Sequence, residues 1–315
     1  MKNFADALVR AIAEKNNPTV MGLDPRLEYI PEHIIEKANL NFDDPETSTA
    51  QAILMFNKEL IDAVQDIVPA IKPQFAYYEM YGIEGLRALK ATIDYAKSKG
   101  MLVIADAKRN DIGTTATAYA AGIIGQTTII DGSTHEMIGA DAVTVNGYLG
   151  IDGIKPFTDV CRESGKGIFA LVRTSNPSAV DLQDLELSDG RKVYEAMAQK
   201  VEEWGVDCIG DEGFSSVGAV VGATWPEQAV AIRKLMPHAM ILVPGYGAQG
   251  AGPDQAVASF TEDGRGSIVN ASRSLMCAWM KRDDLAPEDF AKATRDEAIN
   301  MKNKLNAALK DRKYV

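Results

Sequence analysis

The stretch Leu-Val-Ile-Ala-Asp-Ala-Lys-Arg-Asn-Asp, residues 102–111, joins a short apolar run to a group of charged residues. An apolar run that does not alternate with polar residues is typical of a strand covered on both faces, as in parallel sheets. Seven further runs of this kind recur along the chain, at residues 20–24, 68–72, 142–146, 167–173, 217–222, 240–244 and 267–271. Together with residues 102–106 they predict eight buried strands.

Helical patterns separate many of the predicted strands. Apolar residues recur at helical spacing over 48–66, 85–97 and 290–309, and further helices are expected over 193–204 and 225–236. Eight strand–helix repeats in 315 residues predict an α/β fold, a single (β/α)8 TIM-barrel domain over residues 1–315. An open doubly wound sheet is the alternative, and it is disfavoured because no Gly-x-Gly-x-x-Gly motif follows the first strand.

The composition is that of an ordinary globular protein, with 46% apolar and 24% charged residues. The 44 acidic residues outnumber the 33 basic ones, which argues against binding to nucleic acid or to an anionic membrane surface. No apolar run approaches the ~18 residues of a membrane span. Phe4, Leu8 and Ile12 predict an amphipathic helix rather than a signal peptide. We therefore expect a cytoplasmic protein, and the scattered three cysteines and three histidines favour reduced thiols and no metal centre.

Two segments are longer than a minimal barrel needs, residues 25–48 after the first strand and residues 176–216 after the fifth. Each follows the carboxyl end of a strand, the face on which barrels build their active sites. Each segment is interpreted equally well as a lid over the site or as an elaboration packed on the rim.

Charged residues stand at the ends of the first three predicted strands. Asp106 and Lys108 are two residues apart, so the period of two in a strand places both side chains on one face. Asp111 follows three residues later, and two carboxylates around the Lys108 ammonium would keep it protonated. Lys72 and Asp24 end the second and first strands in the same way. The charges at three successive strand ends predict one catalytic pocket, and the alternative is a set of unrelated structural ion pairs.

The loops after the last two strands predict a phosphate site. Pro244-Gly-Tyr-Gly-Ala-Gln249-Gly-Ala-Gly follows the seventh strand, and small residues let backbone N–H groups approach an anion. Arg273 follows the eighth strand at an expected helix start, and its planar fork of donors suits a phosphate. Barrels commonly hold a phosphate in these two loops, although most glycine-rich segments are only turns. Ser175, after the fifth strand, is either a ligand donor or a turn residue.

The motif Asp-Ala-Lys-Arg-Asn-Asp-Ile-Gly-Thr-Thr, residues 106–115, resembles the signature of the orotidine 5′-phosphate decarboxylase family. Supporting matches occur in the family's order and surround Asp24 (GLDP), Lys72 (IKPQ), Ser175 (RTSNP), Gln249 (PGYGAQG) and Arg273 (NASR). The two long segments are similar to those of the larger bacterial members of the family.

The resemblance implies a role for each matching residue. Lys72, Asp106, Lys108 and Asp111 would form an alternating network of charges, with Asp111, Ile112 and Thr115 reaching the site of the partner subunit in a homodimer. Asp24 would bind a ribose hydroxyl with Lys72, and Ser175 would contact the pyrimidine. Gln249 and Arg273 would hold the 5′-phosphate, with Pro244 in the same loop as Gln249.

The activity that the resemblance implies is decarboxylation of orotidine 5′-phosphate to UMP and CO₂, in de novo pyrimidine biosynthesis, without a cofactor or metal. Asp106 would lie beside the substrate carboxylate and disfavour the bound ground state, while Lys108 would stabilise the carbanion and protonate C6. Two alternatives stay open. A magnesium-dependent sugar-phosphate decarboxylase or aldolase of the same suprafamily shares Asp-x-Lys-x-x-Asp but carries an acidic residue in place of Lys72. A non-catalytic barrel that binds a phospho-ligand needs only the phosphate loops.

Overall fold

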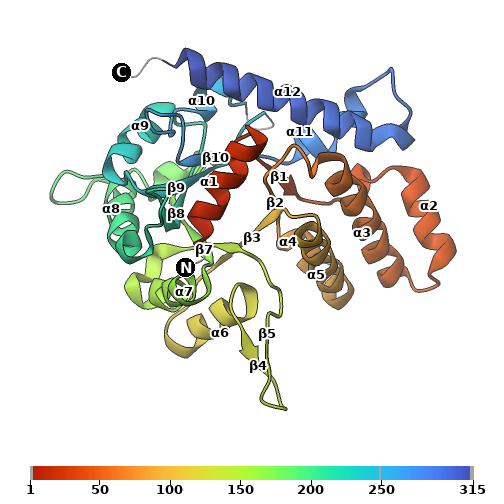
Figure 1. The fold of residues 1–315 in the computed structure, drawn as a ribbon, viewed down its shortest axis with the longest axis horizontal. Helices are drawn as coiled ribbons and strands as arrows, with labels where there is room; N and C mark the ends of the chain where they lie inside the picture. The colour runs from red at the N-terminus through yellow and green to blue at the C-terminus, as the bar shows by residue number, and fades with distance from the viewer. Residues whose placement is uncertain (1–2, 248–249, 313–315) are drawn as a thin grey trace.

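The computed structural model describes residues 3–247 and 250–312. Eight parallel strands form a closed barrel in the order β1-β10-β9-β8-β7-β6-β3-β2 (Figure 1). Their bounds are β1 Thr19–Leu23, β2 Ala70–Pro73, β3 Leu102–Arg109, β6 Ala142–Val145, β7 Gly167–Arg173, β8 Ser215–Val221, β9 Ala239–Val243 and β10 Ser267–Ala271. The predicted barrel is confirmed, and all eight predicted strands are present. The main difference is that β3 runs three residues beyond its predicted end at residue 106.

Helices surround the barrel (Figure 1). Their bounds are α1 Phe4–Lys15, α2 Glu32–Asn41, α3 Pro45–Val64, α4 Ala76–Glu79, α5 Gly82–Ser98, α6 Gly113–Ile123, α7 Ile151–Ser164, α8 Val193–Gly205, α9 Pro226–Leu235, α10 Pro253–Ala256, α11 Arg273–Met276 and α12 Phe290–Asp311. Between α6 and β6 the strands β4 (Thr127–Thr128) and β5 (Thr134–His135) pair as an unpredicted hairpin, whose strands of two residues are too short to show a pattern. Over the described ranges, no helix is long and apolar enough to cross a bilayer.

Local signals account for two helix ends. The carboxylate of Asp44 accepts a hydrogen bond from the backbone N–H of Thr47 at 2.8 Å, and Pro45 occupies the first helical position. These two residues start α3 three residues before its predicted start at residue 48. The helix α1 ends at Asn16, whose left-handed backbone (φ 46°) is a common way to terminate a helix.

The helix α1 covers the amino-terminal end of the barrel (Figure 1). Phe4 packs edge-on against Phe169 of β7, with ring centroids 5.9 Å apart. Gly167 makes room for this contact, because a Cβ at that position would lie 2.2 Å from the Phe4 ring. The carboxylate of Asp6 accepts hydrogen bonds from the backbone N–H groups of residues 211 and 212, at 3.0 and 2.9 Å. The apolar residues under α1 form a core of their own, separate from the larger core between strands and outer helices.

The two long segments contribute to the outer layer and to the wall of the cavity described below. In residues 25–48, α2 packs against α3, while Arg26 and Tyr29 line the cavity. Residues 176–216 include α8 on the outside, while Asn176 and Gln183 line the cavity.

Candidate active site

A cavity of about 680 Å³ lies at the carboxyl ends of the barrel strands. Of the residues that the sequence predicts for the site, seven line this cavity, namely Asp24, Lys72, Asp106, Lys108, Ser175, Pro244 and Arg273. They come from six different strands or the loops that follow them, so the convergence predicted from strand ends is present in the structure.

Asp106 is the centre of the charges. Its Oδ2 lies 2.6 Å from Nζ of Lys72, and its Oδ1 lies 2.6 Å from Nζ of Lys108. Lys72 is 4% exposed and Asp106 is 7% exposed, whereas the side chain of Lys108 is half exposed to the cavity. Within the described chain one carboxylate thus lies between two ammonium groups, in the order Lys72, Asp106, Lys108 of the predicted alternating network.

The charges in this cluster shift the pKa values of Asp106 and Lys72. Burial alone would raise the pKa of Asp106, but the positive charges of Lys72 and Lys108 outweigh burial and hold this pKa well below its ordinary value. Burial alone would lower the pKa of Lys72, but the carboxylates of Asp106 and Asp24 outweigh it and raise this pKa. Asp106 is therefore ionised and Lys72 protonated near neutral pH.

Two neutral side chains complete the shell of Asp106, and sequence reasoning missed both. The hydroxyl of Thr144 on β6 donates to Oδ1 at 2.9 Å, and the amide of Gln74 donates to Oδ2 at 3.1 Å. Each had a signal in the sequence. Thr144 is a polar residue inside the apolar run 142–146, and Gln74 lies two residues after Lys72 at the end of the same strand.

The backbone at Lys108 is not an extended strand. Its φ is +48°, a left-handed conformation that is uncommon for a residue other than glycine. The pairing of β3 with β6 also shifts register between Ala105 and Arg109. The prediction that Asp106 and Lys108 share a face by strand periodicity is thus wrong in its reason, although the two side chains do meet.

Asp24 lies in the wall of the cavity, close enough to Lys72 for its charge to raise that pKa. Its Oδ1 is buried and finds no hydrogen-bond partner within the described part of the chain. Buried carboxylate oxygens are normally paired. This oxygen is therefore available to a donor from a ligand, such as a hydroxyl group.

The far side of the cavity carries the predicted phosphate residues. Pro244, Tyr246 and Arg273 line it, and Gly245 and Gly247 have φ of +102° and +70°, conformations that favour glycine. The guanidinium of Arg273 is exposed and has no hydrogen-bond or ion-pair partner among residues 3–247 and 250–312. The helix that Arg273 begins is a single turn of four residues, shorter than the final helical segment expected there. Gln249 lies outside the described residues.

Ser175 lies in a loop that two unpredicted residues hold in place. Arg173 is fully buried; its Nη2 lies 3.1 Å from Oδ2 of Asp184, and its guanidinium stacks 4.2 Å from the ring centroid of Trp225. The side-chain oxygen of Gln183 accepts from the backbone N–H of Thr174 at 2.9 Å. These contacts orient the loop, which places Ser175 against the cavity.

Asp111, Ile112 and Thr115 do not line the cavity. The carboxylate of Asp111 accepts from the backbone N–H of Ile112 at 2.8 Å, Ile112 is 52% exposed, and Thr115 is exposed on α6. The start of α7 lies beside this loop, because a Cβ on Gly153 would lie 3.0 Å from the backbone oxygen of Asp111. Tyr148, Leu149 and Ile151 near that helix start are also exposed.

In the described ranges, no group of three or more His, Cys, Asp and Glu residues is arranged to hold a metal ion. The three cysteines, Cys161, Cys208 and Cys277, are free and buried.

These features define a class: a (β/α)8-barrel enzyme whose cavity is lined by a Lys–Asp–Lys cluster and by an exposed arginine. The model of the orotidine 5′-phosphate decarboxylase / HUMPS family matches residues 44–283, and the chain belongs to this family.

Known relatives agree with this assignment. An orotidine 5′-phosphate decarboxylase of Caldicellulosiruptor bescii is 40% identical over 98% of this chain and 100% of its own length. The structure of Leishmania donovani OMP decarboxylase has a TM-score of 0.70 at 30% identity and covers 96% of this chain and 99% of its own. The structure of Leishmania donovani UMP synthase has a TM-score of 0.77 at 30% identity, and the chain spans 58% of that longer protein.

Proposed function

We propose that this protein decarboxylates orotidine 5′-phosphate to UMP and CO₂. The observation that carries the proposal is the ionised Asp106 held between Lys72 and Lys108, in a cavity that the exposed Arg273 also lines. The family and the names of the relatives support the same reaction. We place the reaction in de novo pyrimidine biosynthesis in the cytoplasm, a reducing compartment in which three free cysteines are ordinary.

The geometry supports a mechanism with two charged partners. In this proposal Asp106 lies beside the substrate carboxylate, and like charges at close range disfavour the bound ground state. As the bond from C6 to the carboxylate breaks, CO₂ leaves and the electron pair stays on C6. The ammonium of Lys108 stabilises that negative charge and then donates its proton to C6, which yields UMP. Preorganised charges in a cavity that excludes water are the main source of such stabilisation.

The remaining predicted site residues hold the parts of the substrate that are distant from the reacting bond. Asp24 accepts from a ribose hydroxyl and Lys72 donates to one, Ser175 contacts the pyrimidine, and Gln249, Pro244 and Arg273 contact the phosphate. Arg273→Ala should weaken binding of orotidine 5′-phosphate by about 1.5–3 kcal/mol, the range for a hydrogen bond to a charged group. Orotidine without its phosphate should bind almost equally well to both proteins. Equal losses for the two ligands would place Arg273 elsewhere.

The reaction needs no cofactor or metal in this proposal. Magnesium-dependent relatives would need a carboxylate where Lys72 stands, and the Lys72 ammonium at the centre of the site would repel a cation. The test is the fall in absorbance of orotidine 5′-phosphate with purified protein, before and after exhaustive chelation. Turnover that survives chelation supports the proposal. Loss on chelation with recovery on added Mg²⁺ favours the sugar-phosphate alternative, and binding without turnover favours a non-catalytic barrel.

We further propose a homodimer with shared active sites. The support is the placement of Asp111, Ile112 and Thr115 on an exposed face outside their own cavity, beside further exposed apolar residues at the start of α7. In a two-fold dimer such a face meets its own copy. Asp111 would then join the charges around Lys108 of the partner subunit.

Subunit exchange tests this arrangement. Lys108→Ala and Asp111→Ala are each expected to be inactive. If Asp111 acts in the partner's site, a mixed dimer has one site with both changes and one site with neither. Random pairing makes about half of the dimers mixed, so roughly a quarter of the wild-type activity should return. Verified exchange without recovery would reject the shared site and leave the decarboxylase proposal intact.

A further inference from the structure

We propose that Thr144 is a positioning residue that holds Lys108 and Asp106 in their reacting arrangement. This inference rests on the proposed decarboxylase function and deepens it, because it names a residue that acts on the proton donor without being the donor. It is carried by three observations: the two hydrogen bonds of the Thr144 hydroxyl, the left-handed backbone of Lys108, and the register shift opposite Thr144.

The hydroxyl of Thr144 both accepts and donates a hydrogen bond. Its Oγ1 accepts from the backbone N–H of Lys108 at 2.9 Å and lies 2.9 Å from Oδ1 of Asp106. The backbone N–H can only donate, so the single proton of the hydroxyl is free to go to Asp106. Thr144 is 1% exposed, which leaves little competition from water for these bonds. The arrangement is complete only when Asp106 is ionised, the state that the mechanism requires.

The position of Thr144 in the sheet explains why a side chain is needed there. On β6, Val143 pairs with Ala105 and Val145 pairs with Arg109, so three residues of β3, 106–108, stand opposite Thr144 alone. The regular backbone ladder is interrupted at this point. The Thr144 hydroxyl accepts from the Lys108 N–H, which the interrupted ladder would otherwise leave without a partner in the barrel wall.

The bulge in β3 accompanies the left-handed backbone of Lys108, and this backbone conformation sets the position of the Lys108 ammonium. A left-handed backbone is disfavoured for lysine and persists only where the surroundings support it. With the N–H of Lys108 held by Thr144, the side chain folds back so that Nζ lies 2.6 Å from Oδ1 of Asp106. Thr144 therefore binds both ends of this pair, the backbone of the lysine and the carboxylate of the aspartate.

The experiment compares Thr144→Val with Thr144→Ser in the turnover of orotidine 5′-phosphate. Valine keeps the shape of threonine and removes the hydroxyl, while serine keeps the hydroxyl. We expect Thr144→Val to lower kcat by about 10- to 100-fold, the size of effect that a displacement of about 1 Å produces at a reacting group. Thr144→Ser should recover most of the wild-type kcat.

Binding of UMP separates positioning from a general structural role. UMP has no carboxylate at C6 and needs no proton from Lys108, so its Kd by calorimetry should change by less than about threefold in Thr144→Val. A matched control is Gln74→Leu, which removes a hydrogen bond to Asp106 but leaves the backbone N–H of Lys108 satisfied. We expect Gln74→Leu to lower kcat less than Thr144→Val does.

Several outcomes would overturn the inference. They are an unchanged kcat in Thr144→Val, an equal loss in Thr144→Ser, a parallel loss of UMP binding and thermal stability, or a loss in Gln74→Leu as large as that in Thr144→Val. A wild-type protein that does not turn over orotidine 5′-phosphate would reject the proposed function instead, and this inference with it. Wild-type turnover in the same assay therefore distinguishes the two failures.

Discussion

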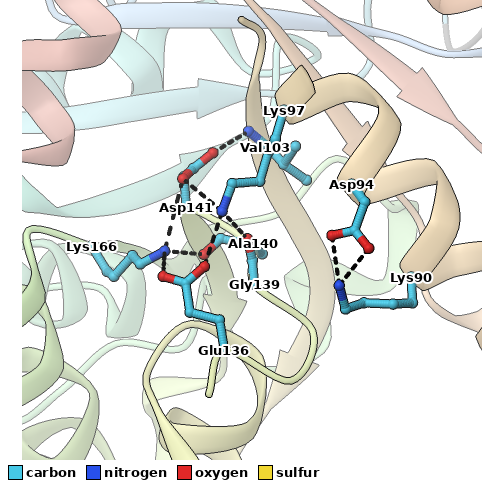
Figure 2. A network of polar contacts seen from close by, with 9 residues as sticks. All are labelled: Lys90, Asp94, Lys97, Val103, Glu136, Gly139, Ala140, Asp141 and Lys166. Atoms are coloured by element: carbon cyan, nitrogen blue, oxygen red, sulfur yellow. Dashed lines mark hydrogen bonds and ion pairs between the residues drawn. The ribbon is translucent and has the colours of Figure 1, made fainter. Parts of the chain in front are cut away.

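Two clusters of lysine and carboxylate side chains lie at opposite ends of the barrel. The cavity cluster, Lys72, Asp106 and Lys108, lies at the carboxyl ends of the strands. The base cluster, Lys97, Glu136, Asp141 and Lys166, lies at their amino ends, where Asp141 precedes β6 and Lys166 precedes β7 (Figure 2). The two clusters contain the same kinds of residue, yet their other hydrogen bonds differ.

In the base cluster the polar groups also bind the backbone (Figure 2). Nζ of Lys97 donates to the carbonyl of Gly139 at 2.7 Å, and Nζ of Lys166 donates to the carbonyl of Ala140 at 3.1 Å. The carboxylate of Asp141 accepts from the N–H of Val103 at 2.9 Å. This cluster joins α5 and the segment after the β4–β5 hairpin to the starts of β3, β6 and β7.

In the cavity cluster the two ammonium groups share Asp106. Both lysines line the cavity, and in the described chain neither ammonium donates to a backbone carbonyl. The backbone of Lys108 is left-handed, whereas the base cluster shows no such residue in the described chain. The comparison teaches that charge composition does not identify an active site. What identifies it is hydrogen-bonding capacity left for a ligand, together with a backbone conformation that needs support.

The largest expected effect contrasts two buried lysines. Lys72→Met should lower kcat/KM for orotidine 5′-phosphate by at least ~10³-fold, because the preorganised charge beside Asp106 is lost. Lys166→Met, the same change in the base cluster, should leave kcat/KM within about threefold of wild type, because Lys166 lies at the other end of the barrel from the cavity. Steady-state kinetics on folded, purified variants gives both numbers. Comparable losses in the two variants would remove the functional distinction between the clusters.

The contrast also marks what the sequence could predict. The eight strands follow from apolar runs, and Lys72 and Asp106 follow from their places at strand ends. The left-handed Lys108 could not be predicted, because its cause is a bulge opposite Thr144, which lies 36 residues away in the chain. The base cluster was missed for a similar reason: Glu136 follows a short hairpin with no periodicity, and its partners come from α5 and the start of β7.

A smaller effect is expected on stability. Lys166 is 7% exposed and lies 2.9 Å from Oε1 of Glu136, so Lys166→Met should lower the free energy of unfolding by about 1–3 kcal/mol. The control is Lys90→Met, which breaks the exposed pair with Asp94 on α5 (Figure 2) and should cost less than about 1 kcal/mol. Urea unfolding followed by circular dichroism measures both. If Lys90→Met costs as much as Lys166→Met, burial adds nothing to the base cluster.

The smallest expected effect is a difference in pH dependence between the two carboxylates of the base cluster. Burial raises the pKa of Asp141 above its ordinary value of 3.8, and the Val103 N–H and the two lysines only partly offset this. For Glu136 burial acts in the same direction, but Lys166 and Lys97 outweigh it and hold the pKa below its ordinary value of 4.5. The same two lysines therefore stabilise the ionised form of Glu136 more effectively than that of Asp141.

The signs of the two contributions to stability are opposite. The lowered pKa of Glu136 stabilises the folded protein above pH 4.5, and this contribution is lost as the pH falls through the pKa of Glu136 in the folded protein. The raised pKa of Asp141 stabilises the folded protein below pH 3.8, and this contribution is lost as the pH rises through the pKa of Asp141 in the folded protein. The stability difference between wild type and Glu136→Gln should therefore shrink from pH 7 toward about pH 3. The difference for Asp141→Asn, whose amide oxygen still accepts from Val103, should grow in favour of wild type over the same range. Urea midpoints measured across that range decide the matter, and parallel slopes for the two variants would show that Asp141 is paired as well as Glu136.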